Sequence, residues 1–591
     1  MKYINFYLPY FAFLFFTFLG LLIWDLIKIN INPLQDFIRF YTYILISLVP
    51  TYFVIKNNWK NIYPISEIFT KTKNTPSIKS DINYLYYFFI ILIILSFLTL
   101  EPKEFYNLDL YHDGFSLTPS MNFLLTKSFW GSSFIEAGLY PNFKPLIITF
   151  FTDKLTIGSK FFLTYLIIFL NKFLLVTLVK LILDKLDFSK SYKIIFFILF
   201  SLMVLNFAKY DDTTYFPERY FLYLIFFILI YFNFFCSSKR YIYISSFFIA
   251  SLSVLSIFWY FDVFLFINTS FFLYLIFLYL VKDRNKIKQI IFSLLFFTLL
   301  FFLFFPNNEL IDFAKNQYFI IFEINKFTSI DYPSPTEFSD GRALKTLFLF
   351  PYSGLLLMMI ILKKNILISN KLKIFFIILF ISSLVSFLYG LGRSDSYHII
   401  YSTGLLMFNL VLFHLILFFF YIQRNKIIIN KFLIYLTSFV LLSFISFHQI
   451  NINKIKNINN FNQNIQTLIS AEDQSFLRGK NREYLKLISY YKNILDPKDC
   501  VQIFTDETLI PYFLKKKTCT KYFFNHIIKS EKLQNDLIFE LKMDMPKYIL
   551  YKSEFFDFNF FKELNIVNDF IDLNYEFHDK YLYWTFFKLK N

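Results

Sequence analysis

Charged residues are scarce in this chain. Asp, Glu, Lys and Arg make up 17% of its 591 residues, whereas 57% are hydrophobic and the mean hydropathy is +0.50. A soluble protein of this size is excluded, because the apolar residues are far too many and are gathered in blocks of membrane-spanning length. We therefore predict a polytopic α-helical membrane protein.

Two further features are absent. No small-residue cleavage site follows the first apolar block after Lys2, so we interpret that block as an uncleaved span rather than a signal peptide. The C-terminal tail has no glycine-rich phosphate loop, so no nucleotide is assigned to it. The net charge of +17 would indicate nucleic acid in a soluble protein. Here the lysines fall between apolar blocks, and the positive-inside bias explains them without a nucleic-acid partner.

About thirteen apolar blocks are long enough to cross a membrane. They lie near residues 7–27, 38–55, 84–100, 160–181, 193–208, 220–235, 242–258, 263–281, 289–305, 344–362, 373–390, 398–421 and 431–448. The loop after every even-numbered block is basic, which places these loops in the cytoplasm. Alternation then predicts an N-terminus inside, an odd number of spans and a tail outside.

The predicted outer loops carry the side chains that could do chemistry. The first, 101–159, contains Asp109-Leu-Tyr-His-Asp113-Gly114 directly after an apolar block. Ionisable groups in such a setting indicate a functional site, although Asp-Gly is also an ordinary turn pair. In the same loop we predict two short helices on the membrane surface. Thr118 caps the first, which ends at Gly131, and a capping box at Ser133–Glu136 begins the second.

Other predicted outer loops add acidic and basic groups. These are Asp211, Asp212 and Arg219, the long loop 306–343 with Arg342, and Arg393 with His398. Lys and Arg together number 59, and only nine of them are arginines. Three of these arginines, Arg219, Arg342 and Arg393, nevertheless lie on outer loops, where charge balance does not require them. A planar bidentate donor suits phosphate recognition. Helix-end arginines that anchor at lipid headgroups are the alternative.

The tail, 451–591, changes character. After a polar linker, Asn451–Gln466, helices are predicted near 484–495, 509–514 and 531–541. Strands are predicted at 500–505, 519–524, 548–551 and as a pair around 575–588. This alternation predicts a small α/β domain with a largely parallel sheet. Cys500 and Cys519 each open a strand. If these strands are parallel neighbours, the two cysteines lie within disulfide reach, and an oxidising exterior favours the bond.

The order of these loops resembles the polyprenyl-phosphate-sugar-dependent glycosyltransferases of the GT-C fold, such as protein O-mannosyltransferases and the lipid A aminoarabinose transferase. In that group a long acidic outer loop follows the first span of the shared module. A short acidic outer loop follows the third span, and a second long outer loop follows the seventh span. If the block at 84–100 begins the module, all three loops correspond. The resemblance implies two extra N-terminal spans in 1–83, a catalytic module in 84–450, and an extracytoplasmic domain in 451–591.

The resemblance implies an inverting hexosyl- or pentosyltransferase of a bacterial cytoplasmic membrane. Its donor is a polyprenyl-phosphate sugar, and its acceptor is an envelope glycan, lipid or protein. Such a site needs a general base and cations for the leaving phosphate, from side chains or a metal. We assign Asp113 as base, with Asp109 as the alternative. Asp211 and Asp212 position the base, or bind Mg²⁺ or Mn²⁺ together with Asp109 and His112. Arg393 and His398 contact the phosphate, and Arg219 is a weaker candidate.

Two other classes of function remain open. A transporter or flippase of lipid-linked glycans places polar and broken-helix features near the midplane, often in repeated halves. Only Lys172 and His414 are conspicuous at mid-depth here, and no clear internal repeat is found. His414 is interpreted as a helix-to-helix hydrogen bond. An adhesion protein without chemistry would not require clustered carboxylates on several outer loops.

Overall fold

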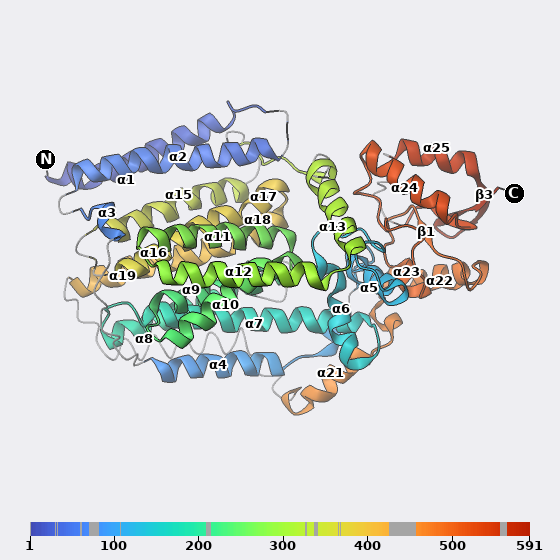
Figure 1. Cartoon of the computed structure of the whole chain (residues 1–591), viewed down its shortest axis with the longest axis horizontal. Helices are drawn as coiled ribbons and strands as arrows, with labels where there is room; N and C mark the ends of the chain where they lie inside the picture. Colours follow the sequence, from blue (N-terminus) through green and yellow to red (C-terminus); the bar gives the residue numbers. More distant parts are fainter. Residues whose placement is uncertain are drawn as a thin grey trace.

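The structure is a computed structural model. It describes residues 2–29, 31, 33–59, 62–69, 82–106, 108–208, 214–324, 328–335, 341–363, 366, 368–424, 457–555 and 564–590. Long helices run side by side in a bundle, and a smaller C-terminal region, residues 457–590, is stacked on one end of it (Figure 1). We call this end of the bundle the sheet end and the opposite end the far end.

Ten helices in the described chain are long and apolar enough to cross a membrane. They are α1 (Lys2–Trp24), α2 (Leu34–Asn58), α7 (Ile157–Leu183), α8 (Lys190–Phe207), α10 (Lys239–Leu255), α11 (Phe261–Leu280), α12 (Arg284–Phe304), α15 (Gly341–Leu362), α16 (Asn370–Ser386) and α19 (Gly404–Arg424). Two shorter apolar helices, α4 (Asn83–Leu98) and α9 (Tyr220–Phe235), correspond to the third and sixth predicted blocks. The thirteenth block, 431–448, lies outside the described residues.

The connecting loops gather at the two ends as the predicted alternation requires. At the far end, the Asn370 side chain donates to the Glu67 carbonyl at 2.6 Å. At the sheet end, the Phe261 N–H donates to the Ala137 carbonyl at 3.0 Å, joining two predicted outer loops. At the far end, the Gln423 side chain donates to the Asp187 carbonyl. At the sheet end, the Asn464 side chain donates to the Leu100 carbonyl. Residues 423 and 464 therefore lie at opposite ends of the bundle.

The predicted surface helices are wrong in position. Helix α5 spans Gly114–Thr126, so it begins four residues before the predicted cap, and α6 spans Leu139–Thr152. Pro119 lies inside α5 rather than at its start. Proline has no N–H, so the Phe115 carbonyl accepts from the Asn142 side chain at 2.7 Å instead. Residues 133–136 are not helical, and α5 is mostly buried rather than lying on the membrane surface.

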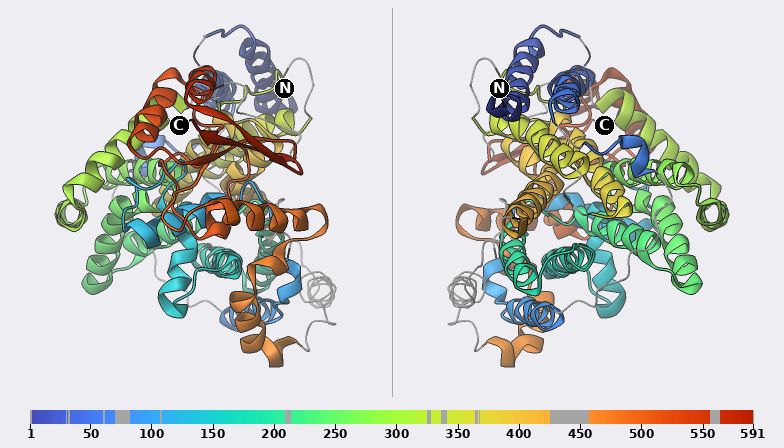
Figure 2. Two further views of the ribbon diagram at one scale, coloured as in Figure 1. Left: turned by 90° about the vertical axis from the view of Figure 1, so that its right-hand side faces the viewer. Right: turned by 90° about the vertical axis from the view of Figure 1, so that its left-hand side faces the viewer.

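The C-terminal region contains α21 (Phe461–Ser470), α22 (Glu483–Ile494), α23 (Ile510–Leu514), α24 (Glu531–Met543), α25 (Asn565–Asn574) and two 3-10 turns, η5 (Asp473–Phe476) and η6 (Gly479–Arg482). Its strands are β1 (Gln502–Ile503), β2 (Tyr548–Ser553), β3 (Tyr575–Tyr581) and β4 (Trp584–Leu589). They form one sheet in the order β1-β2-β4-β3 (Figure 2, left).

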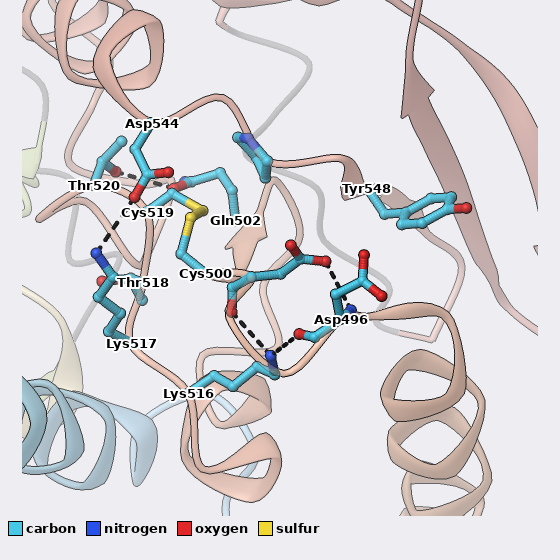
Figure 3. Close-up of a disulfide and its surroundings, with 12 residues drawn as sticks. Asp496, Cys500, Gln502, Lys516, Lys517, Thr518, Cys519, Thr520, Asp544 and Tyr548 are labelled. Carbon is cyan, nitrogen blue, oxygen red and sulfur yellow. Dashed lines mark hydrogen bonds and ion pairs between the residues drawn. A yellow bond between two sulfur atoms is a disulfide. The ribbon is translucent and has the colours of Figure 1, made fainter.

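Two predictions for the tail are wrong. The sheet is mixed rather than largely parallel, because only β1 and β2 are parallel and both pairings of β4 are antiparallel. Residues 519–524 form no strand, since their segment makes only an isolated bridge between Val501 and Thr518. Helix α21 (Phe461–Ser470) begins within the predicted linker, Asn451–Gln466, and extends beyond it. Figure 3 shows Cys500 joined by a disulfide to Cys519, with Cα atoms 4.9 Å apart, so the start of β1 is tied to this irregular segment.

Candidate active site

The Asp109–Gly114 motif is a tight turn that leads into α5. Asp109 Oδ1 accepts from the N–H groups of Tyr111 and His112 at 2.9 and 3.1 Å. The Asp109 N–H in turn donates to Asp113 Oδ2 at 2.8 Å. Asp113 is the N-cap residue of α5. Both carboxylates therefore have a structural part in the turn, which explains why the motif folds locally.

His112 and Asp109 form an exposed pair. His112 Nδ1 lies 2.6 Å from Asp109 Oδ2, and the two side chains are 67% and 52% exposed. Burial alone would raise the pKa of Asp109, but hydrogen bonds and charge from His112, together with the Tyr111 N–H, lower it to about 2. A carboxylate bound to Nδ1 orients the imidazole and leaves Nε2 pointing away, which is the arrangement of a general-base dyad.

Asp113 has different surroundings. Its side chain is only 10% exposed and forms an ion pair with Lys160 near the first turn of α7. A second buried pair lies nearby, where Lys144 of α6 contacts Glu218 at 2.7 Å and Tyr140 donates to the same carboxylate at 3.0 Å. Burial raises the pKa of Glu218, but Lys144 outweighs this and lowers it. The sheet end of α7 is thus lined by paired charges.

Sequence reasoning missed Lys160 and Lys144. Both are lysines on the predicted outer side, Lys144 within the loop 101–159 and Lys160 at the start of the block 160–181, where the positive-inside bias does not call for them. That misplaced charge is the signal that could have identified them. Neither pairing partner could be read from the sequence, because Glu218 is distant from Lys144 along the chain and Asp113 is distant from Lys160.

Arg393 and His398 meet at one carboxylate. Asp395 caps α18 (Ser396–Ser402). Its Oδ1 accepts from the His398 N–H at 3.0 Å and lies 2.7 Å from His398 Nδ1. Arg393 Nε lies 3.3 Å from Asp395, with the arginine side chain 44% exposed. Although burial raises the pKa of Asp395, these contacts lower it to about 2. Burial lowers the pKa of His398 despite Asp395.

The charge of Arg393 reaches the first loop. Burial raises the pKa of Glu136, and Arg393 opposes that rise. Arg393 also adds to the burial that lowers the pKa of His526 to about 3. The loops around residues 109–114, 136 and 393–398 therefore lie close enough to share one electrostatic environment.

Arg219 is committed to other protein groups. Its guanidinium contacts Asp262 at 2.6 Å and lies 3.6 Å from the centroid of the Tyr389 ring. The structure thus uses Arg219 to join the loop before α9 to α11 and α17 (Leu388–Gly392). One guanidinium nitrogen of Arg219 is bound by Asp262 and its side chain is 13% exposed, whereas the side chain of Arg393 is 44% exposed.

The C-terminal region contributes to the same place. Tyr111 Oη lies 2.7 Å from His526 Nδ1, and both residues are buried. His526 Nε2 is 3.7 Å from Glu136. The Thr508 hydroxyl donates to the carbonyls of Tyr111 and Leu110, the latter at 3.3 Å. Nothing in the sequence signals His526, because its contact with Tyr111 spans 415 residues.

The predicted metal site is incomplete in the described chain. Asp211 and Asp212 lie outside the described residues, and among the residues that are described no three His, Cys, Asp or Glu side chains are placed to hold a metal. Asp109 and His112 are together, but they bind each other. A metal at this turn would therefore need Asp211 or Asp212, and the metal role of these four residues stays a prediction.

No protein-family profile and no curated protein matches the chain. Among solved structures, the chain is similar to the crystal structure of ArnT from Cupriavidus metallidurans bound to undecaprenyl phosphate. The similarity covers 86% of this chain and 98% of that chain, at 9% sequence identity and a TM-score of 0.43. At this level of similarity no residue role carries over.

Proposed function

We propose that this chain is a membrane glycosyltransferase, which moves a sugar from a polyprenyl-phosphate donor to an acceptor on the outer side of the membrane. One observation carries the proposal. The exposed Asp109–His112 pair and the exposed Arg393 stand at the same end of a membrane-spanning bundle, within one electrostatic environment. A general base and a phosphate-binding cation are the two groups that this transfer needs. The donor class rests on the resemblance between the order of the outer loops and that of the GT-C glycosyltransferases.

The exposed pair suits deprotonation better than Asp113 does. An acceptor hydroxyl can approach Asp109 and His112, whereas Asp113 is buried against Lys160. In the proposed step, the hydroxyl oxygen attacks the anomeric carbon and its proton passes to His112 Nε2. Asp109 holds the imidazole in orientation and stabilises its charge. Asp113 then acts as a positioning residue, because it binds the Asp109 N–H.

The leaving group is the lipid phosphate. As the new carbon–oxygen bond forms, the bond between the anomeric carbon and the phosphate oxygen breaks, and its electron pair leaves with the phosphate. A single displacement of this kind inverts the anomeric configuration. Arg393 binds the phosphate of the donor with its planar guanidinium, and His398 stands beside it on Asp395. The apolar helices keep the polyprenyl chain in the bilayer while its head group reaches the sheet end.

A transfer assay tests the proposal. The purified protein is placed in lipid nanodiscs with polyprenyl-phosphate hexoses and pentoses and with a cell-envelope extract as acceptor, and product masses are measured. The expected result is an acceptor heavier by one sugar residue. Movement of intact donor across sealed vesicles without any modified acceptor would instead establish a flippase.

The orientation is tested separately. Asn58 ends α2 and Asn307 begins α13 (Asn307–Phe319), at opposite ends of the bundle (Figure 1). Single cysteines are introduced at each position in a chain in which Cys236 is replaced. A membrane-impermeant thiol reagent applied to intact cells should label the cysteine at 307 and spare the one at 58. Labelling at 58 alone would place the sheet end in the cytoplasm and remove the outer-face reaction.

A further inference from the structure

A cavity of about 590 Å³ lies apart from the Asp109–Gly114 turn. Its walls are α13 and α24, and its floor is formed by Trp130, Gly131 and Lys521. In Figure 1, α13 stands at the sheet end of the bundle beside α24 of the C-terminal region. The volume is within the range of small-molecule pockets, roughly 300–1,000 Å³.

The two helices line the cavity differently. Helix α24 lines it with Asp536, Phe539, Glu540 and Met543, and these residues share one helix face because they are three or four apart. Helix α13 lines it with Asp312, Ala314, Lys315, Asn316, Tyr318 and Phe319, which cover more than one face. The exposed rings are Phe539, at 61%, and Tyr318, at 45%. The cavity thus offers two aromatic surfaces to solvent.

The charges in the cavity nearly cancel. Lys521 contacts Asp536 at 2.6 Å and Glu540 at 2.7 Å, so this cation is already neutralised. In the part of the chain that the structure describes, Asp312 and Lys315 have neither a hydrogen-bond nor an ion-pair partner on their side chains. They therefore offer one acceptor group and one donor group to a ligand. A cavity without surplus positive charge is unsuited to the phosphate of a lipid-linked donor.

The floor of the cavity leads to the candidate active site. The Phe134 N–H donates to the Lys521 carbonyl at 2.8 Å, and the Phe134 ring stacks on Tyr522 with centroids 5.4 Å apart. A few residues further on, Glu136 approaches His526, which contacts Tyr111 of the motif. Segments 130–136 and 521–526 therefore run side by side from the cavity to the turn.

From these observations we propose that the cavity binds a short neutral saccharide. A sugar ring has an apolar face that can lie on Phe539 or Tyr318, and hydroxyl groups that can bond to Asp312 and Lys315. The inference deepens the proposed function and rests on it in one respect, since the saccharide would be the glycan part of the acceptor. Binding itself requires neither donor nor transfer.

The test is binding of the full-length protein, in nanodiscs, to an array of neutral, sialylated and phosphorylated oligosaccharides. Two variants alter the cavity, Phe539→Ala and the milder Asp312→Asn. Phe577→Ala is the matched control, because Phe577 of β3 is exposed to a similar degree, 63%, and does not line the cavity. Thermal unfolding is recorded for every variant.

We expect neutral oligosaccharides to bind the wild type and Phe577→Ala equally, and to bind both cavity variants at least tenfold more weakly. Absence of binding to any array member, binding to anionic glycans alone, or equal binding by the folded cavity variants would each overturn the proposal. Binding by a protein that transfers no sugar would leave the cavity assignment intact and refute the proposed function. Normal transfer by both cavity variants, together with absence of saccharide binding, would refute the cavity assignment and leave the proposed function intact.

Discussion

At the scale of single residues, the two carboxylates of the motif have unlike surroundings. Asp109 is half exposed and bound to His112, whereas Asp113 is buried and bound to Lys160. The surroundings of a carboxylate decide its role. Asp109 is placed to act on a substrate with His112, and Asp113 is placed to hold the turn together. The sequence ranked Asp113 first as base, with Asp109 as the alternative, whereas the proposed function makes His112 the base and Asp109 the group that orients it.

Removing one partner of a buried ion pair leaves the other charge uncompensated, which costs roughly 3–5 kcal/mol. We therefore expect Asp113→Asn to lower stability markedly, and Asp113→Asn combined with Lys160→Met to recover most of the loss. Thermal unfolding of the four proteins in this double-mutant cycle measures the coupling. Strictly additive effects would show that the pair is not formed.

Arg393, between α17 and α18, gives another prediction for a single residue. Arg393→Lys keeps the charge and loses the planar fork. If Arg393 holds the donor phosphate, the KM for the donor should rise more than kcat falls. Arg219→Lys is the comparison variant. Because Arg219 is already bound to Asp262, this substitution should chiefly lower thermal stability. A large fall in kcat for Arg393→Lys at saturating donor, with KM unchanged, would contradict the binding role.

At the scale of elements, α5 joins the motif to the C-terminal region. Thr118 donates to the Thr508 carbonyl at 2.6 Å, and Asn122 binds Thr518 at 2.8 Å. Leu117 of α5 packs in one hydrophobic cluster with Leu509 and Trp584. Because α5 begins at the motif, the packing of the C-terminal region also fixes the Asp109–Gly114 turn.

Gly114 allows this close approach. A Cβ atom there would stand 1.9 Å from Thr508 Oγ1 and 2.7 Å from the Thr508 carbonyl carbon. Overpacking of this kind typically costs about 1–3 kcal/mol. Gly114→Ala should therefore lower the unfolding temperature and speed tryptic cleavage of the C-terminal region. Gly341→Ala is the control, since a Cβ at that position meets nothing within 4 Å. Equal behaviour of the two variants would contradict the packing described.

At the scale of the whole molecule, the apolar blocks and the loop charges predicted the bundle well. Twelve blocks are helices, their loops sort to two ends, and His414 lies 2.8 Å from Tyr352 Oη on a neighbouring helix, as expected. Contacts between the tail and the first loop could not be predicted, because no periodicity marks a pair such as Tyr111 and His526. The antiparallel pairing of β2 with β4 was missed for the same reason, whereas β3 and β4 were predicted as a pair.

The buried His526 makes the association of the two parts depend on pH. Its pKa in the folded protein, about 3, lies below the ordinary value of 6.5 because of burial and nearby Arg393. Its stabilising contribution is complete above pH 6.5 and declines as the pH falls toward 3, by at most about 1.4 kcal/mol per pH unit. Between pH 7 and 4, His526→Gln should lose less thermal stability than the wild type. His578→Gln, on exposed β3, should behave like the wild type.

The most direct measurement of the central claim is sugar transfer by Asp109→Asn. With purified protein and radiolabelled polyprenyl-phosphate sugar, label entering the acceptor fraction is compared between wild type, Asp109→Asn and the distant Phe577→Ala. In the proposed step His112 is the base and Asp109 orients it. Replacing the orienting carboxylate of a Ser-His-Asp triad by an amide lowers kcat about 10⁴-fold. The account predicts a loss of that order for Asp109→Asn with a nearly unchanged unfolding temperature, and full transfer by Phe577→Ala. Transfer near the wild-type rate by a folded Asp109→Asn would contradict it.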